Sequence, residues 1–242
     1  MIVRPFKRVP FDNAGYFFIG ILIVAVFGFV PSYFPSFSGN EVEFTFYTHF
    51  HAVNMVLWLG VLIAQPFLIR HGLNHWHQTL GRISYVQVPL WMLSSLLLIH
   101  SRLGTSDLLP VAAHFWIAFK DLVVIGPTYG LAIYYRRNTA YHARFMVGTS
   151  FQLLEPGLTR ALINFLPLPS PVIALVATHL LIDSSLIYLA VKDRKLRRGR
   201  WIFRLVLGMT LSIQLFAYFL VGGPELPWFV GAVEWFSRLN LT

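Results

Sequence analysis

Three histidines and an aspartate lie within strongly apolar stretches of this sequence, at His51, His114, His179 and Asp183. Imidazole nitrogens and carboxylate oxygens are common ligands of zinc, iron and copper. His179 and Asp183 are four residues apart, so a helix places both on one face. Three imidazoles and one carboxylate make a workable ligand set. The spacing therefore predicts a transition-metal site of iron, copper or zinc on these four residues.

Two further acids, Asp121 and Glu155, also lie in apolar surroundings. Ionisable groups inside a membrane cost several kcal/mol unless they are paired, so they are candidates for function. We expect Asp121 to accept a proton beside the metal, and Glu155 to act as a second catalytic acid or as an alternative ligand. The structural alternative is ion pairing of Asp121 with Lys120 or Arg160, and of Glu155 with Arg160.

The composition of the chain predicts that these residues lie on membrane-spanning helices. Of the 242 residues, 56% are hydrophobic and 12% are charged, against about 25% charged in soluble domains. The chain has no cysteine, which excludes disulfides and thiolate metal sites. A membrane-spanning helix needs about 20 apolar residues. The sequence predicts an all-α, seven-span bundle forming one domain over 1–242, with spans at about 16–37, 44–69, 83–101, 108–135, 144–166, 171–191 and 202–221, and an interfacial amphipathic helix over 227–241.

The net charge of +9 is concentrated in particular connections. Most Lys and Arg residues precede the first predicted span or fall in the second, fourth and sixth connections, with the densest run at 192–204. Basic loops stay in the cytoplasm. We therefore expect a protein of the cytoplasmic (inner) membrane with its N-terminus inside and its C-terminus outside. The charge indicates contact with anionic membrane lipid, and no nucleic-acid partner is expected.

This topology predicts the depth of the candidate residues. With a rise of 1.5 Å per residue, His51 and His114 lie roughly 8–9 Å below the outer helix ends and His179 roughly 12–13 Å below. Asp121, Glu155 and Asp183 lie roughly 16–19 Å below. The metal site is thus expected in the outer half of the bundle, with acids beneath it.

A second group of histidines lies at the predicted cytoplasmic edge. The segments His77-Gln-Thr-Leu-Gly81-Arg82 and His142-Ala-Arg-Phe-Met146 resemble a family of uncharacterised bacterial multi-helix membrane proteins, which shows His-Arg-x-Leu-Gly-Arg and His-x-x-Trp-Met-Ile-Arg elements. Gln replaces Arg in the first element here, and Phe replaces Trp in the second. The His-x-x-Leu-Gly element is also similar to one in b561-type membrane cytochromes. That similarity implies haem b on His77 or His142.

Three functions follow as hypotheses. The first is a membrane metalloprotein that acts as an oxidoreductase on a lipid-soluble small molecule such as a quinone, fatty acyl group or sterol. The second is a b-type haem cytochrome, which requires histidines at matched depth across a gap. The third is a proton- or ion-coupled transporter that uses Asp121, Glu155, Asp183 and Arg160 as a relay.

Overall fold

The structure is a computed structural model that describes residues 11–33, 44–103 and 111–242. The described chain is all-α, as predicted. Its helices are α1 (Ala14–Tyr33), α2 (Phe46–Arg70), α3 (Asn74–Arg102), α4 (Val111–Tyr134), α5 (Thr139–Phe165), α6 (Pro171–Lys192), the short 3₁₀ helix η2 (Asp193–Lys195), α7 (Ile202–Gly222) and α8 (Pro227–Ser237).

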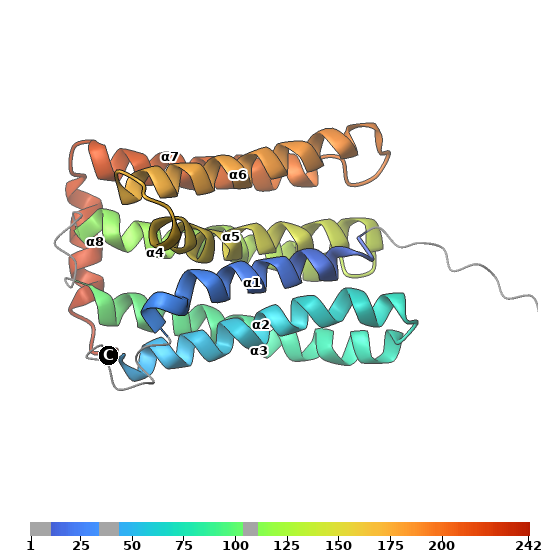
Figure 1. Ribbon diagram of the computed structural model, residues 1–242. Helices are drawn as coiled ribbons and strands as arrows, with labels where there is room; N and C mark the ends of the chain where they lie inside the picture. The colour runs from blue at the N-terminus through green and yellow to red at the C-terminus, as the bar shows by residue number, and fades with distance from the viewer. Residues whose placement is uncertain (1–10, 34–43, 104–110) are drawn as a thin grey trace, which may run out of the picture.

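Six of these helices, α1 to α4, α6 and α7, are long and apolar enough to cross a membrane. The seven helices α1 to α7 run side by side along the long axis of the molecule, and α8 crosses one end of them (Figure 1). Six such helices in one bundle are typical of a polytopic membrane protein. The connections α2–α3, α4–α5 and α6–α7 lie together at the end opposite α8.

Helix α5 is the central element of the bundle. It packs against α1, α4, α6 and α7. It is not among the six apolar helices, but its polar side chains Arg144, Gln152 and Glu155 are buried. Because neighbouring helices shield α5 from the surroundings, it does not need an apolar surface.

The helix contacts form two groups that share α4 and α5. Helices α1 to α5 make a closed cycle, since each packs on the next and α5 packs back on α1. Helices α4 to α7 make a second cycle, closed by α4 against α7. Glycines allow α1 and α5 to approach each other closely. A side chain at Gly28 would meet the backbone of Gly157, and one at Gly157 would meet the backbone of Ala25.

Most predicted helix ends agree with the structure to within a few residues. The largest difference is in α3, which begins at Asn74 instead of residue 83. The low hydropathy of the polar segment His75–Arg82 predicts a connection between helices. In the structure this segment instead forms two helical turns that precede the apolar part of α3. Helix α5 likewise begins at Thr139, five residues before the predicted start. Predicted residues 34–37 and 108–110 lie outside the described part of the chain.

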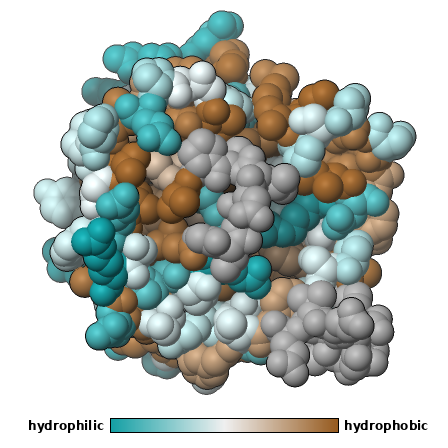
Figure 2. All heavy atoms as spheres, turned by 90° about the vertical axis from the view of Figure 1, so that its left-hand side faces the viewer, coloured by the Kyte–Doolittle hydropathy of each residue, from teal (hydrophilic) through white to brown (hydrophobic). Residues whose placement is uncertain are grey.

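The segment after α7 is amphipathic, as predicted. In α8, Phe229 and Val233 are buried against Ala112, Ala113 and Leu220. On its other face, Trp228 and Trp235 are 67% and 65% exposed. Figure 2 shows this end of the molecule, where hydrophobic and hydrophilic side chains are intermixed. Exposed tryptophans on a short helix across the bundle end are typical of residues at headgroup depth.

Candidate functional site

A buried lysine holds two carboxylates together in the middle of the bundle. Lys120 on α4 is fully buried. Its Nζ lies 2.8 Å from Asp121 Oδ1 and 2.5 Å from Glu155 Oε2 on α5. The side chain of Asp121 is 16% exposed and that of Glu155 is 6% exposed. Buried charges are tolerated when they are paired in this way, so the lysine makes it possible for both acids to lie in the interior.

The same carboxylate oxygen of Glu155 also contacts a histidine. His179 Nε2 on α6 lies 3.0 Å from Glu155 Oε2, and its Nδ1 lies 2.6 Å from the hydroxyl of Tyr218 on α7. With Glu155 ionised, His179 Nε2–H donates to the carboxylate and Nδ1 accepts from the Tyr218 hydroxyl. Both ring nitrogens are therefore engaged, and the histidine connects α5 to α7.

The result is one continuous chain of side chains across four helices, which we call the Lys120 network: Asp121, Lys120, Glu155, His179 and Tyr218. Counted from the helix ends nearest α8, Lys120, Glu155 and His179 lie about 12–15 Å deep. That is near the middle of a hydrocarbon core of about 30 Å. The packing of apolar helices does not itself require ionisable side chains at this depth.

Neighbouring hydrogen bonds hold the helices that carry this network. Gln152 Nε2 donates to Thr210 Oγ1 at 2.8 Å, which joins α5 to α7. Thr159 Oγ1 donates to Thr178 Oγ1 at 3.1 Å, which joins α5 to α6. Interhelical hydrogen bonds of this kind fix the relative rotation of membrane helices. The network is therefore held in place by polar contacts on either side of Glu155.

Asp183 lies beside this chain without completing it. It is one turn below His179 on α6 and within electrostatic reach of both His179 and Glu155. Its Oδ1 atom is buried and has no hydrogen-bond partner among the described residues. The side-chain amide of Gln214 on α7 lies beside this carboxyl group, and its Nε2 likewise has no partner among the described residues.

The predicted metal ligands do not assemble into one group. His51 Nδ1 faces the hydroxyls of Ser94 and Ser95 on α3, at 3.3 and 3.2 Å. His114 is half-buried and has Arg102 in its surroundings. Within the described residues, no cluster of three or more His, Asp or Glu could hold a metal ion. Of the four predicted ligands only His179 is buried, and the other three are partly exposed. The four-ligand site is not supported among the described residues.

Of the pairings considered as the structural alternative, the one between Lys120 and Asp121 is present. Arg160 instead donates to the backbone carbonyl of Pro156 at 3.2 Å, and its guanidinium lies 4.5 Å from the centre of the Phe29 ring. Sequence reasoning also missed Tyr218. A tyrosine within an apolar helix looks like an ordinary membrane aromatic, and only the position of His179 reveals its hydroxyl as a partner.

The two histidines predicted as haem ligands do lie next to one another. The rings of His77 on α3 and His142 on α5 have centroids 6.4 Å apart, at the end of the bundle opposite α8. They are separate from the Lys120 network, whose residues on α4, α5 and α6 lie nearer the α8 end of the bundle. The molecule thus has two distinct polar clusters.

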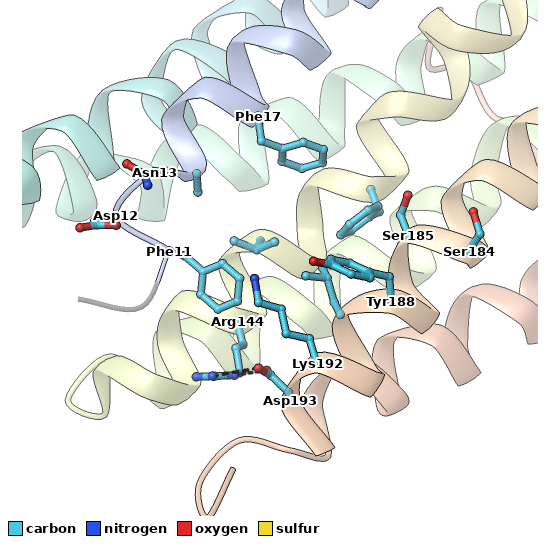
Figure 3. A pocket seen from close by; sticks show the side chains of 14 residues that line it. Phe11, Asp12, Asn13, Phe17, Arg144, Ser184, Ser185, Tyr188, Lys192 and Asp193 are labelled. Carbon is cyan, nitrogen blue, oxygen red and sulfur yellow. Dashed lines mark hydrogen bonds and ion pairs between the residues drawn. The ribbon is translucent and has the colours of Figure 1, made fainter. Parts of the chain in front are cut away.

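A groove of about 810 Å³ opens between α1 and α6 and is floored by α5, at the end of the bundle opposite α8. Figure 3 shows the side chains of Lys192, Tyr188 and Phe11 converging in it. At its base, Arg144 Nε donates to Asp193 Oδ2 at 2.5 Å, and both side chains are almost fully buried. This ion pair fixes the start of α5 to the end of α6.

Comparison of the chain with known protein families, with curated proteins and with solved structures finds no match. The functional conclusion below therefore rests on the geometry of the Lys120 network.

Proposed function

We propose that this chain is a proton-coupled transporter of the cytoplasmic membrane, in which the Lys120 network takes up and passes on protons. The observation that carries the proposal is the unbroken series of contacts from Asp121 through Lys120, Glu155 and His179 to Tyr218. Chains of ionisable residues inside a membrane bundle are the usual means of moving protons.

The charges of the cluster support proton uptake. Asp121, Glu155 and Asp183 are three acids that lie around a single lysine. With His179 neutral and all three acids ionised, the cluster would carry an excess of negative charge in a medium of low dielectric constant. Such an excess is unfavourable. Binding a proton at His179 or at one of the acids reduces this excess, so the site is suited to bind and release a proton.

His179 is the group best placed to pass a proton along the chain. An imidazole can accept a proton at one nitrogen and release the other proton from the second nitrogen. Here Nδ1 faces Tyr218, which lies about 6 Å from the α8 end of α7, and Nε2 faces Glu155 at mid-depth. Lys120 supplies the fixed positive charge that stabilises ionised Glu155 between transfers.

The membrane topology that we propose has seven spans, α1 to α7. Six are apolar helices, and α5, with 27 residues, is about 40 Å long and polar only where it is shielded. The basic segment after α6 and the α2–α3 and α4–α5 connections share one end of the bundle. The positive-inside rule places that end in the cytoplasm, which puts the N-terminus inside and α8 at the outer surface. For the cargo we propose a lipid-soluble small molecule, the class expected from the sequence as the substrate of an oxidoreductase.

The test is proton flux into proteoliposomes that contain a pH-sensitive dye, with an imposed pH gradient and a potassium potential. We expect wild-type protein to carry protons, and Glu155→Gln to lower the flux about 100-fold. Glu234→Gln is the matched control, because Glu234 is an exposed acid on α8. Wild-type flux equal to that of protein-free liposomes, or undiminished flux through Glu155→Gln, would overturn the proposal.

A further inference from the structure

Two histidines from separate helices meet at the basic end of the bundle. His77 lies in the first turn of α3 and His142 in the first turn of α5. Their ring centroids are 6.4 Å apart and their planes are nearly perpendicular, at 86°. Neither ring belongs to the Lys120 network.

The ring of His142 is held in the manner of a metal ligand. Its Nδ1 lies 2.8 Å from the backbone carbonyl oxygen of Ala132 on α4. A carbonyl oxygen only accepts, so Nδ1 carries the hydrogen and Nε2 keeps a free lone pair. Histidines that bind metals almost always donate their other ring N–H to a carbonyl or carboxylate, which fixes the tautomer and the ring orientation.

Two buried polar atoms, on His77 and on its neighbour Gln65, have no hydrogen-bond partner among the described residues. They are His77 Nδ1 and Gln65 Oε1. Gln65 on α2 is held beside His77, because its Nε2 donates to the His77 backbone oxygen at 3.2 Å. The ring of His77 also lies against the backbone carbonyl of Gln65. Leaving one buried acceptor unpaired costs about 1–3 kcal/mol, so two in one place indicate a missing ligand.

We propose that His77, His142 and Gln65 bind a divalent transition-metal ion of the zinc or copper class, with water completing the coordination. Metal–nitrogen bonds of about 2.0–2.1 Å place an ion roughly 3 Å from each ring centroid. The two centroids are 6.4 Å apart, slightly more than twice that distance. One ion can therefore bind both rings if they lie on opposite sides of it and move together by a few tenths of an ångström. Imidazole ligands select zinc, copper or nickel over magnesium and calcium, which prefer oxygen ligands.

A bound ion would connect the ends of α2, α3 and α5 at the face where these helices leave the membrane. The ligand set contains no carboxylate or thiolate, so the ion would keep its positive charge and be held less tightly than in a structural zinc site. This site is independent of the proposed proton path, and each can fail without the other.

The direct test is metal binding by purified full-length protein that carries no polyhistidine tag and has been stripped with a chelator. After titration with Zn²⁺ and gel filtration, we expect about one retained zinc per chain. His77→Ala and His142→Ala should each weaken binding about 10- to 100-fold or more. His71→Ala and His75→Ala are the matched controls, because these histidines are exposed and flank the same connection.

A second measurement uses unmodified protein and so does not depend on the folding of any variant. With Cu²⁺ as the probe, pulsed electron paramagnetic resonance of the wild-type protein should show two coupled imidazole nitrogens. As a separate check on the third ligand, Gln65→Leu should alter that spectrum. Zinc retained equally by all four histidine variants, or copper coupled to fewer than two imidazoles, would refute the site. A Soret band from added haem that disappears in His77→Ala would equally refute it, in favour of haem.

Discussion

Lys120 Nζ lies 2.5 Å from Glu155 Oε2, although the two residues are 35 positions apart in the sequence and come from different helices. This contact joins α4 to α5, the two helices that both cycles of the bundle share. The lysine is fully buried, so the positive charge it supplies is screened little by water. The acids that we assign to proton exchange depend on it.

Removing this lysine should destabilise the fold. Lys120→Met leaves Asp121 and Glu155 buried without a positive partner, which we expect to cost about 3–5 kcal/mol in the free energy of unfolding. The measurement is reversible unfolding in mixed micelles. Adding Glu155→Gln to Lys120→Met should recover part of the loss, because it removes one unpaired charge. A double variant no more stable than the single one would show that charge is not the cause.

Tyr218→Phe should slow proton flux while the protein stays folded. The change removes the hydroxyl that lies 2.6 Å from His179 Nδ1, and it leaves that nitrogen without its partner. The expected loss of stability is about 1–3 kcal/mol. Tyr188→Phe serves as the control in the same liposome assay, because Tyr188 is 63% exposed. Equal flux through both variants would remove Tyr218 from the path.

The ion pair of Arg144 and Asp193 should be structural. Both residues are buried at the base of the groove between α1 and α6. Arg144→Gln alone should lower the unfolding free energy by about 3–5 kcal/mol, because Asp193 is left buried and unpaired. Proton flux per folded molecule should not change. A flux loss larger than the loss of folded protein would instead place this pair in the transport path.

The contact of α1 with α5 should not tolerate side chains at its glycines. Gly28→Ala and Gly157→Ala would each place a methyl group against the opposite backbone, and overpacking of this kind costs about 1–3 kcal/mol. Gly20→Ala is the matched control on α1, since a side chain there meets nothing within 4 Å. The measurement is the melting temperature of each variant in detergent, which should fall for Gly28→Ala and Gly157→Ala but not for Gly20→Ala. Similar melting temperatures for all three variants would contradict the close packing.

Hydropathy predicted the helices well because lipid-facing surface has to be apolar along the full width of the membrane. The same signal failed at the start of α3, where His75 and Trp76 lie in helical turns beyond the apolar part. Hydropathy indicates the length of chain that is apolar enough to lie in lipid, and a helix can extend beyond that length. Helix α5 was found from its apolar stretches, although polar residues lower its overall hydropathy.

The candidate site was predictable only in part. Periodicity showed that His179 and Glu155 face the interior, and these two do meet at 3.0 Å. It also placed His51 on an interior face, but that histidine contacts serines of α3. Periodicity gives the face of each helix and says nothing of which helix lies opposite. The central position of Lys120 depends on how α4 and α5 are rotated against each other, which only tertiary packing determines.

The shielding of α5 has a consequence for how the protein is made. Translocon insertion is less favourable by about 2.5–3.5 kcal/mol for a charged residue such as Arg or Asp at the centre of a helix, and α5 carries Glu155 and Arg160 in its interior. Emerging alone from the ribosome, it is a poor candidate for partitioning into lipid. In the seven-span topology that we propose, the retention of α5 in the bilayer requires α4, which supplies Lys120, and α6, which supplies His179. We therefore expect these helices to enter the bilayer as a group.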